Sequence, residues 1–352
     1  MTKLFVYEYL TGGGIDPALA GEASLLDLSA LIVEGRAMRD ALVKDLLDLG
    51  GVQVTFASSR FETVSETVDP ALSHCRAMPG ESITGFVARV ARLHDWAWII
   101  APECDGLLLR LHDSVGSARW LGCSKEAIRI ASSKSATAAC LEAHGIAVTP
   151  AVEPGVSAVT TNAQARWVVK PDDGAGGLDT FVYDRFDDAC AEYDARAAAG
   201  RNPILQEWVD GEPLSLSLVC GEHEVELVSI NRQLIGLPDT AAAGKKERVV
   251  EFSGVEVDQI DRQSVQGMAL EALAQRIVAA LHGLRGFVGI DLVWHAQRGP
   301  VVIEVNPRLT AAYAGLSARL GRNLAGDLLK AHGVSHLGCG ANAEACALGL
   351  RS

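Results

Sequence analysis

The stretch FVGIDLVWHAQRGPVVIEVNPR, residues 287–308, decides how the rest of the chain is interpreted. It holds two apolar runs, Phe287–Trp294 and Pro300–Val305, and a polar turn with a glycine, His295–Gly299, lies between them. Two apolar runs joined by so short a turn predict a pair of adjacent antiparallel strands. Strands this apolar belong in a hydrophobic core, so any polar side chain on them needs a physical reason.

Three oxygen-bearing side chains interrupt the apolar pattern: Asp291, Glu304 and Asn306. A buried carboxylate without a partner is costly, and two facing carboxylates repel each other unless a cation joins them. Hard oxygen ligands indicate Mg²⁺ rather than zinc. Arg308 follows closely and is suited to hold phosphoryl oxygens beside such a metal. The alternative is a hairpin whose acids point to solvent, but it leaves the shared polar face of Glu304 and Asn306 unexplained.

Composition favours a soluble protein with several packed units. The chain has 352 residues, 49% of them hydrophobic, which is enough for two or three units with large cores. Its net charge of −13 argues against a broad surface for nucleic acid or anionic membranes. No apolar run reaches the length of about 20 residues that spans a bilayer, and the first residues lack a signal-peptide pattern. The eight cysteines form no CxxC pair and are expected to be reduced. We therefore expect a cytoplasmic protein with neither a nucleic-acid nor a membrane partner.

The first 120 residues have the pattern of a doubly wound α/β domain. A predicted strand at Lys3–Tyr9 runs into the glycine-rich loop Thr11–Gly14, and doubly wound sheets bind ligands where their strands end. The loop matches neither the GxGxxG fingerprint nor a P-loop, so a flexible turn is the alternative. A further predicted strand, Trp96–Pro102, ends at Glu103 and Asp105, which are candidates either to bind an amine or to fix the loop.

Hydrophobic periodicity and turn residues predict the remaining elements. The predicted helices cover residues 25–49, 82–94, 124–145, 187–199 and 263–281, with two more near 310–320 and 323–332. The predicted strands cover residues 52–57, 166–170, 204–209, 214–220, 224–233 and 248–252.

Two lysines are candidates for contacts with phosphate. Lys170 closes a predicted strand just before the glycine-rich segment Asp172–Gly177. A lysine and the backbone N–H groups of such a loop can hold phosphates from two sides, although an ordinary hairpin turn is the alternative. Lys134 lies on the predicted helix 124–145, where a single lysine is most often solvated.

The combination of these motifs is more specific than any one of them. In chain order they are Lys134, Lys170 with its glycine-rich loop, Gln206–Val209 followed by Gly211 and Glu212, Asp291, and Glu304–Arg308. Over about residues 120–335 this order resembles the ATP-grasp superfamily of carboxylate–amine ligases. The resemblance implies an α/β fold in which a doubly wound N-terminal domain precedes a two-lobed α+β grasp. The implied domains are residues 1–120, a small lobe with a glycine-rich lid at 121–205, a large lobe with the metal site at 206–335, and a flexible tail at 336–352.

The resemblance also implies which residues bind ATP: Lys134, Lys170, Gly174, Gly176, Gly177, Glu207, Val209 and Glu212. The lysines would contact the phosphates and the glycines would form the lid. The residues at 207 and 209 would meet the adenine edge, and the one at 212 would meet the ribose. One departure from the pattern is Ser133, because many relatives carry an aspartate before the first lysine.

For the metal, the resemblance implies two Mg²⁺ ions, or Mn²⁺ in their place, held by Asp291, Glu304 and Asn306. Glu304 would bridge the two ions. Arg308 and Lys170 would be the catalytic cations that stabilise the transferring phosphoryl group.

Three loops carry a narrower resemblance, to the branch of the superfamily that joins tyramine to glutamate in the synthesis of methanofuran or methylofuran cofactors. They are Tyr7–Gly14, Ile100–Gly106 and the pair Asn231-Arg232. This resemblance implies that L-glutamate is activated at its side-chain carboxylate and that the amine is tyramine or tyrosine. The implied substrate contacts are Tyr9, Gly12, Gly13, Glu103 and Arg232. For Arg232, a contact with the glutamate α-carboxylate competes with a structural ion pair.

The implied reaction consumes ATP and forms an amide through an acylphosphate, releasing ADP and phosphate. Its partners would be a small carboxylic acid and a small amine, and a homodimer is a common assembly in the superfamily. Two alternatives remain. One is another ATP-grasp ligase for amino acids or peptides from a biosynthetic cluster. The other is a nucleotide-binding regulator without catalysis, which would have no need for the bridging carboxylate of Glu304.

Overall fold

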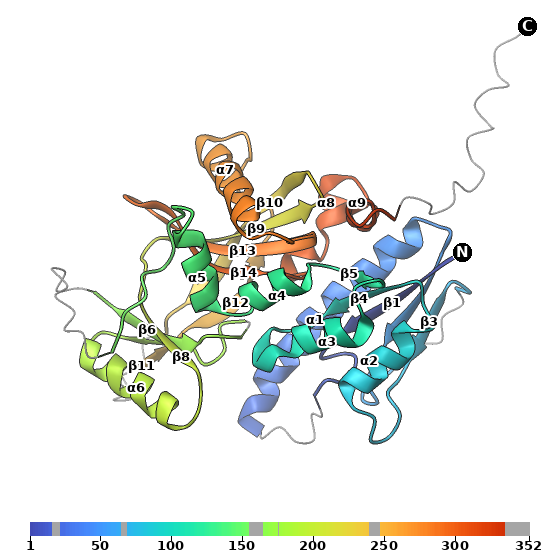
Figure 1. Cartoon of the computed structure of the whole chain (residues 1–352), viewed down its shortest axis with the longest axis horizontal. Coiled ribbons are helices and arrows are strands. Elements are labelled where there is room, and N and C mark those ends of the chain that lie inside the picture. Colours follow the sequence, from blue (N-terminus) through green and yellow to red (C-terminus); the bar gives the residue numbers. More distant parts are fainter. Residues whose placement is uncertain (16–21, 65–68, 155–164, 175, 239–246, 335–352) are drawn as a thin grey trace, which may run out of the picture. The chain divides into compact units, whose positions relative to one another are not determined.

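The computed structural model describes residues 1–15, 22–64, 69–154, 165–174, 176–238 and 247–334 (Figure 1). The chain forms two compact units. The first contains Met1–Ile100, Ser114–Leu121 and the chain from Tyr313 onwards, and the second contains Ala101–Asp113 and Gly122–Ala312. The predicted tail at 336–352 lies outside the described residues.

The first unit is built on a five-stranded parallel sheet with the order β3-β2-β1-β4-β5. Its strands are β1 (Thr2–Glu8), β2 (Val52–Ala57), β3 (Leu72–Cys75), β4 (Trp96–Ile100) and β5 (Trp120–Leu121). The central strand carries a continuous apolar run, Leu4–Tyr7, that is fully buried, as is typical of a parallel strand covered on both faces. The doubly wound class predicted from the sequence is therefore confirmed.

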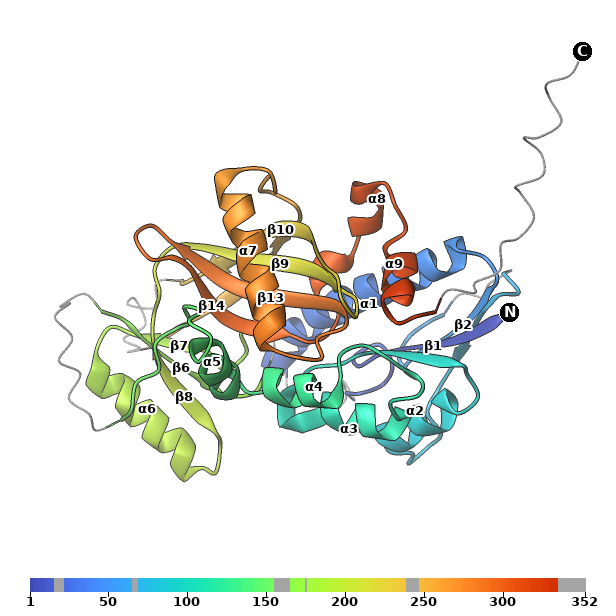
Figure 2. The same ribbon diagram turned by 45° about the horizontal axis from the view of Figure 1, so that its top comes forward.

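Helices α1 (Glu22–Asp48) and α2 (Ile83–Ala91) cover opposite faces of this sheet (Figure 2). The chain crosses from β1 to β2 in one direction and from β3 to β4 in the other. Because such crossovers are right-handed, the two connecting helices must lie on different faces. On the α2 side, the ring of Phe5 meets the ring of Phe86 edge to face, with 6.3 Å between their centroids.

The last elements of the chain return to the first unit. They are the 3₁₀ turn Ala311–Tyr313 and the helices α8 (Leu316–Leu320) and α9 (Leu324–Ala331). The buried carboxylate of Asp45 on α1 accepts hydrogen bonds from Tyr313 Oη at 2.7 Å and from Ser317 Oγ at 2.5 Å. Asn323 Nδ2 donates to the backbone oxygen of Asp45 at 2.7 Å. The sequence placed these residues in the large lobe, and that boundary differs because the bonds to α1 join residues far apart in the chain.

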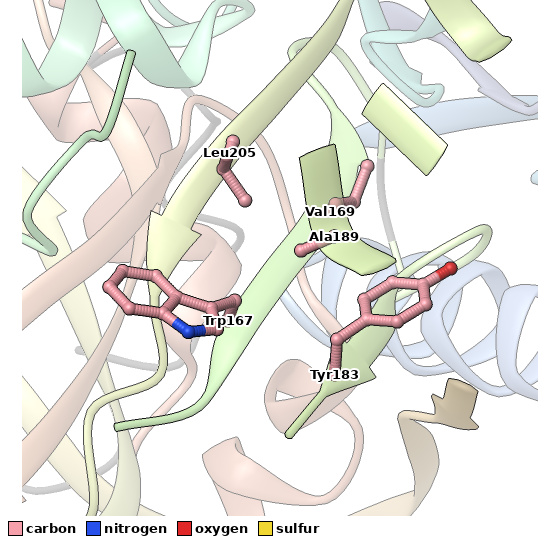
Figure 3. Packing of buried hydrophobic residues seen from close by; sticks show 5 residues of the cluster. All are labelled: Trp167, Val169, Tyr183, Ala189 and Leu205. Atoms are coloured by element: carbon pink, nitrogen blue, oxygen red, sulfur yellow. The ribbon is translucent and has the colours of Figure 1, made fainter. Parts of the chain in front are cut away.

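The second unit contains two antiparallel sheets, and the smaller has the order β11-β7-β6-β8. Its strands are β6 (Trp167–Pro171), β7 (Phe181–Tyr183), β8 (Pro203–Glu207) and β11 (Glu247–Val249). Helix α6 (Phe186–Ala198) packs against it, and the shared core consists of Trp167, Val169, Tyr183, Ala189 and Leu205 (Figure 3). This core fixes β6, and Lys170 lies near the end of that strand.

The larger sheet has the order β12-β10-β9-β13-β14 and is antiparallel throughout. Its strands are β9 (Glu212–Cys220), β10 (Val225–Gly236), β12 (Glu251–Glu256), β13 (Gly286–His295) and β14 (Gly299–Asn306). Helix α7 (Val265–Ala280) lies across one face of it (Figure 2). The hairpin of β13 and β14 matches the two strands predicted from residues 287–305.

One predicted helix is in fact two. Residues 124–145 form α4 (Lys125–Ala131) and α5 (Lys134–Glu142), with the break at Ser132 and Ser133. Ser124 Oγ accepts from Ala127 N and Ser133 Oγ accepts from Ala136 N, so each serine caps the helix that follows it. Among the described residues, no helix is long and apolar enough to cross a membrane.

We predict that Asp45→Ala lowers the free energy of unfolding by about 1–3 kcal/mol, because it removes a buried carboxylate that accepts hydrogen bonds from Tyr313 and Ser317. The measurement is urea unfolding followed by circular dichroism. Asp48→Ala, one turn further along α1, is the control, because its carboxylate is 54% exposed and pairs only with Lys44 among the bonds described. Equal unfolding midpoints for the two variants would contradict the anchoring role of Asp45.

Candidate active site

The two carboxylates predicted to bind metal face each other across the hairpin. Asp291 on β13 pairs directly with Glu304 on β14, and Asn306 Nδ2 donates to Asp291 Oδ2 at 3.1 Å. The register shifts just beyond this pair, because Leu292 is opposite Val302 and Ile303 is left as an extra residue. Such a bulge bends a strand and redirects its side chains, and bulges are frequent beside active sites. The structure thus brings all three predicted metal ligands together.

Space beside these ligands depends on a glycine. Gly289 is opposite Asn306, and a Cβ atom at position 289 would lie 2.6 Å from Thr310 Cγ2 and 3.4 Å from Asn306 Cβ. A side chain at this position would therefore push Asn306 or Thr310 aside.

Two lysines from other elements place positive charge against the carboxylates. Lys134 Nζ lies 3.2 Å from Glu304 Oε2 and donates to the backbone oxygen of Gly174 at 3.0 Å. Lys170, which is buried, comes from the smaller sheet. The sequence predicts both Lys134 and Lys170 as site residues, and in the structure the charges of both act on the carboxylate of Glu304.

The pKa values of these groups are unequal for clear physical reasons. Burial raises the pKa of Asp291 well above its usual range, and the charge of Glu304 raises it further. Burial acts in the same direction on Glu304, but the charges of Lys134 and Lys170 hold the pKa of that carboxyl below its ordinary value. Burial, with the nearby charge of Lys134, lowers the pKa of Lys170 to about 8.

The charges at the site balance while Asp291 keeps its proton, because Glu103, Asp172 and Glu304 then face Lys134, Lys170 and Arg308. Loss of the Asp291 proton adds a negative charge that suits a divalent ion. Among the described residues, no cluster of three His, Cys, Asp or Glu side chains forms a full metal cage. Two carboxylates and an amide suit Mg²⁺, which commonly takes one or two protein carboxylates and completes its shell with phosphates and water.

Ser133 also has a clear structural role. Its Oγ donates to Asp172 Oδ2 at 2.7 Å, and Ser135 N donates to Asp172 Oδ1 at 2.8 Å. The start of α5 is thereby tied to the glycine-rich loop, which helps to fix Lys134. Of the loop glycines, Gly174 has a φ of 131°, and Gly176 and Gly177 each have a φ of 70°, which glycine adopts without strain.

The predicted adenine and ribose residues lie between the end of β8 and the start of β9. Glu207 N donates to the backbone oxygen of Pro150 at 3.0 Å, and Val209 is buried. Glu212 Oε1 accepts a hydrogen bond from Arg232 Nε at 2.8 Å, and Glu256 Oε2 lies 3.9 Å from Arg232 Nη1. Arg232 therefore forms a structural ion pair, which is one of the two roles that the sequence allows for it. The roles of Glu212 and Arg232 toward ligands stay predictions.

The predicted amine-binding loop lies in the first unit. The buried carboxylate of Glu8 accepts from Thr11 N at 2.8 Å and from Thr11 Oγ1 at 2.7 Å. A Cβ atom at Gly12 would lie 2.6 Å from the ring of Tyr7, and one at Gly14 would lie 2.2 Å from the ring of Tyr9. The loop is therefore a packed turn that requires glycine, rather than a flexible one. The substrate roles of Tyr9, Gly12 and Gly13 stay predictions.

A polar strip lies beside Asp291, and the sequence reasoning named only Asn231 from it. Gln233 Nε2 donates to Asp291 Oδ1 at 3.0 Å. On the neighbouring strands the buried Asn231 Nδ2 donates to Ser215 Oγ at 3.3 Å and to Ser217 Oγ at 3.1 Å. The signal in the sequence was alternation, because LSLSL at 214–218 and SINRQ at 229–233 put polar side chains on every second position.

We predict opposite effects for two isosteric variants in the presence of a metal chelator. Because the pKa of Asp291 is raised in the folded protein, that group binds its proton more tightly than in the unfolded chain, and stability falls as pH rises through the raised value. Asp291→Asn has no proton to lose at this position, so it avoids that loss of stability and should raise the melting temperature at pH 8. Glu304→Gln leaves Lys134 and Lys170 without their counter-charge and should lower it. Thermal unfolding between about pH 5 and pH 8 measures the melting temperatures of both variants. Shifts of the same sign in the two variants would contradict the unequal pKa values of the two carboxyl groups.

A second prediction concerns the pH dependence of nucleotide binding. With a pKa of about 8, Lys170 loses its charge in the free protein as pH rises above that value, so affinity for ATP should weaken there. Lys170→Arg keeps the charge at all these pH values and should flatten the dependence. Calorimetric titration with ATP between about pH 7 and pH 9.5 checks this. An equally steep fall in both proteins would show that Lys170 is not the titrating group.

The comparisons with known proteins agree with this geometry. A family model described as an ATP-grasp domain matches residues 131–312, and a model of the pre-ATP-grasp domain matches residues 53–128. Tyramine–L-glutamate ligase of Methanocaldococcus jannaschii is 31% identical over 63% of this chain and 58% of its own length. The match thus spans less than two thirds of that curated relative.

Solved structures show the same fold. A putative ATP-grasp superfamily protein from Archaeoglobus fulgidus has a TM-score of 0.66 at 24% identity, covering 94% of this chain and 88% of its own. L-amino acid ligase from Bacillus licheniformis has a TM-score of 0.61 at 16% identity, covering 95% of this chain and 74% of its own. Because the family model spans more than half of the chain and includes the facing carboxylates and both lysines, the chain belongs to the ATP-grasp family.

Proposed function

We propose that the protein is an ATP-dependent carbon–nitrogen ligase that joins the side-chain carboxylate of L-glutamate to tyramine or tyrosine. The observation that carries this proposal is the pair of facing carboxylates, Asp291 and Glu304, with Lys134 at 3.2 Å from Glu304 and Lys170 beside it. A site that only sensed nucleotide would not need two buried carboxylates whose repulsion destabilises the empty protein. This favours the enzyme over the regulator without catalysis.

The proposed reaction has two steps. An oxygen of the acid attacks the γ-phosphorus of ATP, the bond to the bridging oxygen breaks, and ADP leaves. The nitrogen of the neutral amine then attacks the acyl carbon of the acylphosphate, phosphate leaves, and the nitrogen gives up a proton. The family's divalent ions would neutralise charge on the phosphoryl oxygens during the first step.

The chain's own residues have defined tasks in this proposal. Asp291, Glu304 and Asn306 would hold the ions, and Lys134 and Lys170 would contact the phosphates from the other side. Lys170 reaches the site from a different sheet than the metal hairpin does, so the two can clamp the phosphates between them. Arg308 would hold the oxygens of the acid or of the transferring group. No side chain needs to form a covalent intermediate with the substrate.

The identity of the substrates rests on the curated relative and on the loops at 7–14 and 100–106. A relative named for tyramine and L-glutamate favours an aromatic amine and an acidic amino acid. The amine must be neutral to attack, so turnover at saturating ATP should rise with pH as the ammonium form of the substrate is depleted.

We predict that ADP release from ATP requires both an acid and an amine, with glutamate and tyramine or tyrosine giving the fastest turnover. Asp291→Asn and Glu304→Gln should each lower kcat about 10²-fold or more, because each removes a contact to the charge that develops on the phosphoryl group. The control is Lys125→Ala, one helix before Lys134, because that lysine is 57% exposed and pairs with Asp113. A screen of acid and amine pairs, with the product identified by mass, is the measurement. Turnover with other amino acids alone would favour a different ligase of the family, and full activity in Glu304→Gln would refute the site.

A further inference from the structure

Arg308 is held by a residue from a distant part of the chain. Its Nε donates to Glu103 Oε1 at 2.9 Å and its Nη2 donates to Glu103 Oε2 at 3.0 Å. The two side chains are only 12% and 3% exposed. Two parallel hydrogen bonds between a guanidinium and a carboxylate fix the plane of the guanidinium as well as its position. Glu103 had been predicted to contact a substrate, but in this structure its carboxylate is engaged with Arg308.

The bonding pattern leaves part of the guanidinium able to bind a second anion. A guanidinium has five N–H bonds, and Glu103 accepts two of them. The backbone oxygen of Leu309 accepts one from Nη1 at 3.2 Å. Within the described part of the chain, two N–H bonds remain without an acceptor, one on each Nη nitrogen. This is the number that a carboxylate or phosphoryl group takes in a two-bond contact.

The loop that carries Glu103 is itself fixed. Asp105 N donates to Asp173 Oδ2 at 2.6 Å, so the loop is tied to the glycine-rich segment. Asp105 adopts a left-handed backbone conformation with a φ of 51° and a ψ of 27°, and Arg110 donates to its backbone oxygen. One short loop therefore contacts Arg308 on one side and the glycine-rich segment next to Lys134 on the other.

Without Glu103, Arg308 has other carboxylates to pair with. Its charge already interacts with Asp291 and Glu304 as well as with Glu103. A buried arginine that loses its partner seeks another, because an unpaired buried charge is strongly unfavourable. The other carboxylates whose charges act on Arg308 are Glu304 and Asp291, which are the proposed metal ligands.

We propose that Glu103 is a positioning residue that keeps Arg308 away from Asp291 and Glu304 and turns its two remaining N–H bonds toward the reacting acid. This inference rests on the proposed function and adds a role to it. It assigns Glu103 to the acid and phosphoryl side of the reaction, and not to the amine.

The test compares Glu103→Ala and Glu103→Gln with Glu126→Ala, whose carboxylate is 62% exposed and pairs with Arg129 on the surface of α4. The first two should lower kcat about 10²-fold and raise the KM for the acid, with little change in the KM for the amine. Acetate or formate should restore part of the activity of Glu103→Ala by filling the space of the lost carboxylate, and it should not affect Glu103→Gln. A change confined to the KM of the amine, or a lower KM for the acid, would overturn the proposal.

A second measurement does not depend on turnover. If Arg308 moves onto the metal carboxylates in Glu103→Ala, the Mg²⁺ concentration needed for half-maximal ATP binding should rise about tenfold, and acetate should reverse the shift. Calorimetric titration at several Mg²⁺ concentrations measures this even if no acid and amine pair supports turnover. An unchanged Mg²⁺ requirement in a variant that melts like the wild type would overturn the positioning role while leaving the ligase proposal intact.

Discussion

The repulsion between two carboxylates on adjacent strands is the constraint on which the second unit depends. Unit charges about 4 Å apart repel by about 4 kcal/mol at an effective dielectric near 20, and Asp291 and Glu304 are directly opposite in the register. The protein reduces this cost with charges from separate elements, because Lys134 starts α5 and Lys170 is the penultimate residue of β6. The raised pKa of Asp291 shows the cost that remains, because a proton on this carboxylate relieves the repulsion in the free protein.

The sequence was informative where a residue's role depends on its own neighbours. The two apolar runs and the turn between them in 287–306 predict the hairpin. The shared face of Glu304 and Asn306 follows because strand side chains repeat every two residues. In the same way, the strand at Lys3–Tyr9 that runs into the glycine-rich loop Thr11–Gly14 before a helix predicts a doubly wound sheet. Lys170 was recognisable because a lysine at a strand end before glycines has few structural reasons to be there.

Prediction failed where the information lies in partners distant along the chain, or in segments with weak patterns. β3 reads Leu-Ser-His-Cys, which has no clear alternation, and β5 has only two residues, so neither was predicted. The break before Lys134 was missed because it is set by Ser133 and by Asp172, which lies 39 residues away. The return of residues 313–334 to α1 depends on Asp45, 268 residues before Tyr313.

The pair of Glu103 and Arg308 shows how such a distant partner changes the meaning of a residue. The two lie 205 positions apart, so the sequence alone offers an acid after one strand and a base after another, each free to contact a substrate. Once paired, neither charge is simply available. A buried ion pair is weak evidence for stability, because apolar residues of similar volume often serve as well. The position of the pair beside Asp291 and Glu304 supplies a different reason to keep it. Without a carboxylate of its own, Arg308 would pair with Asp291 and Glu304 and neutralise them.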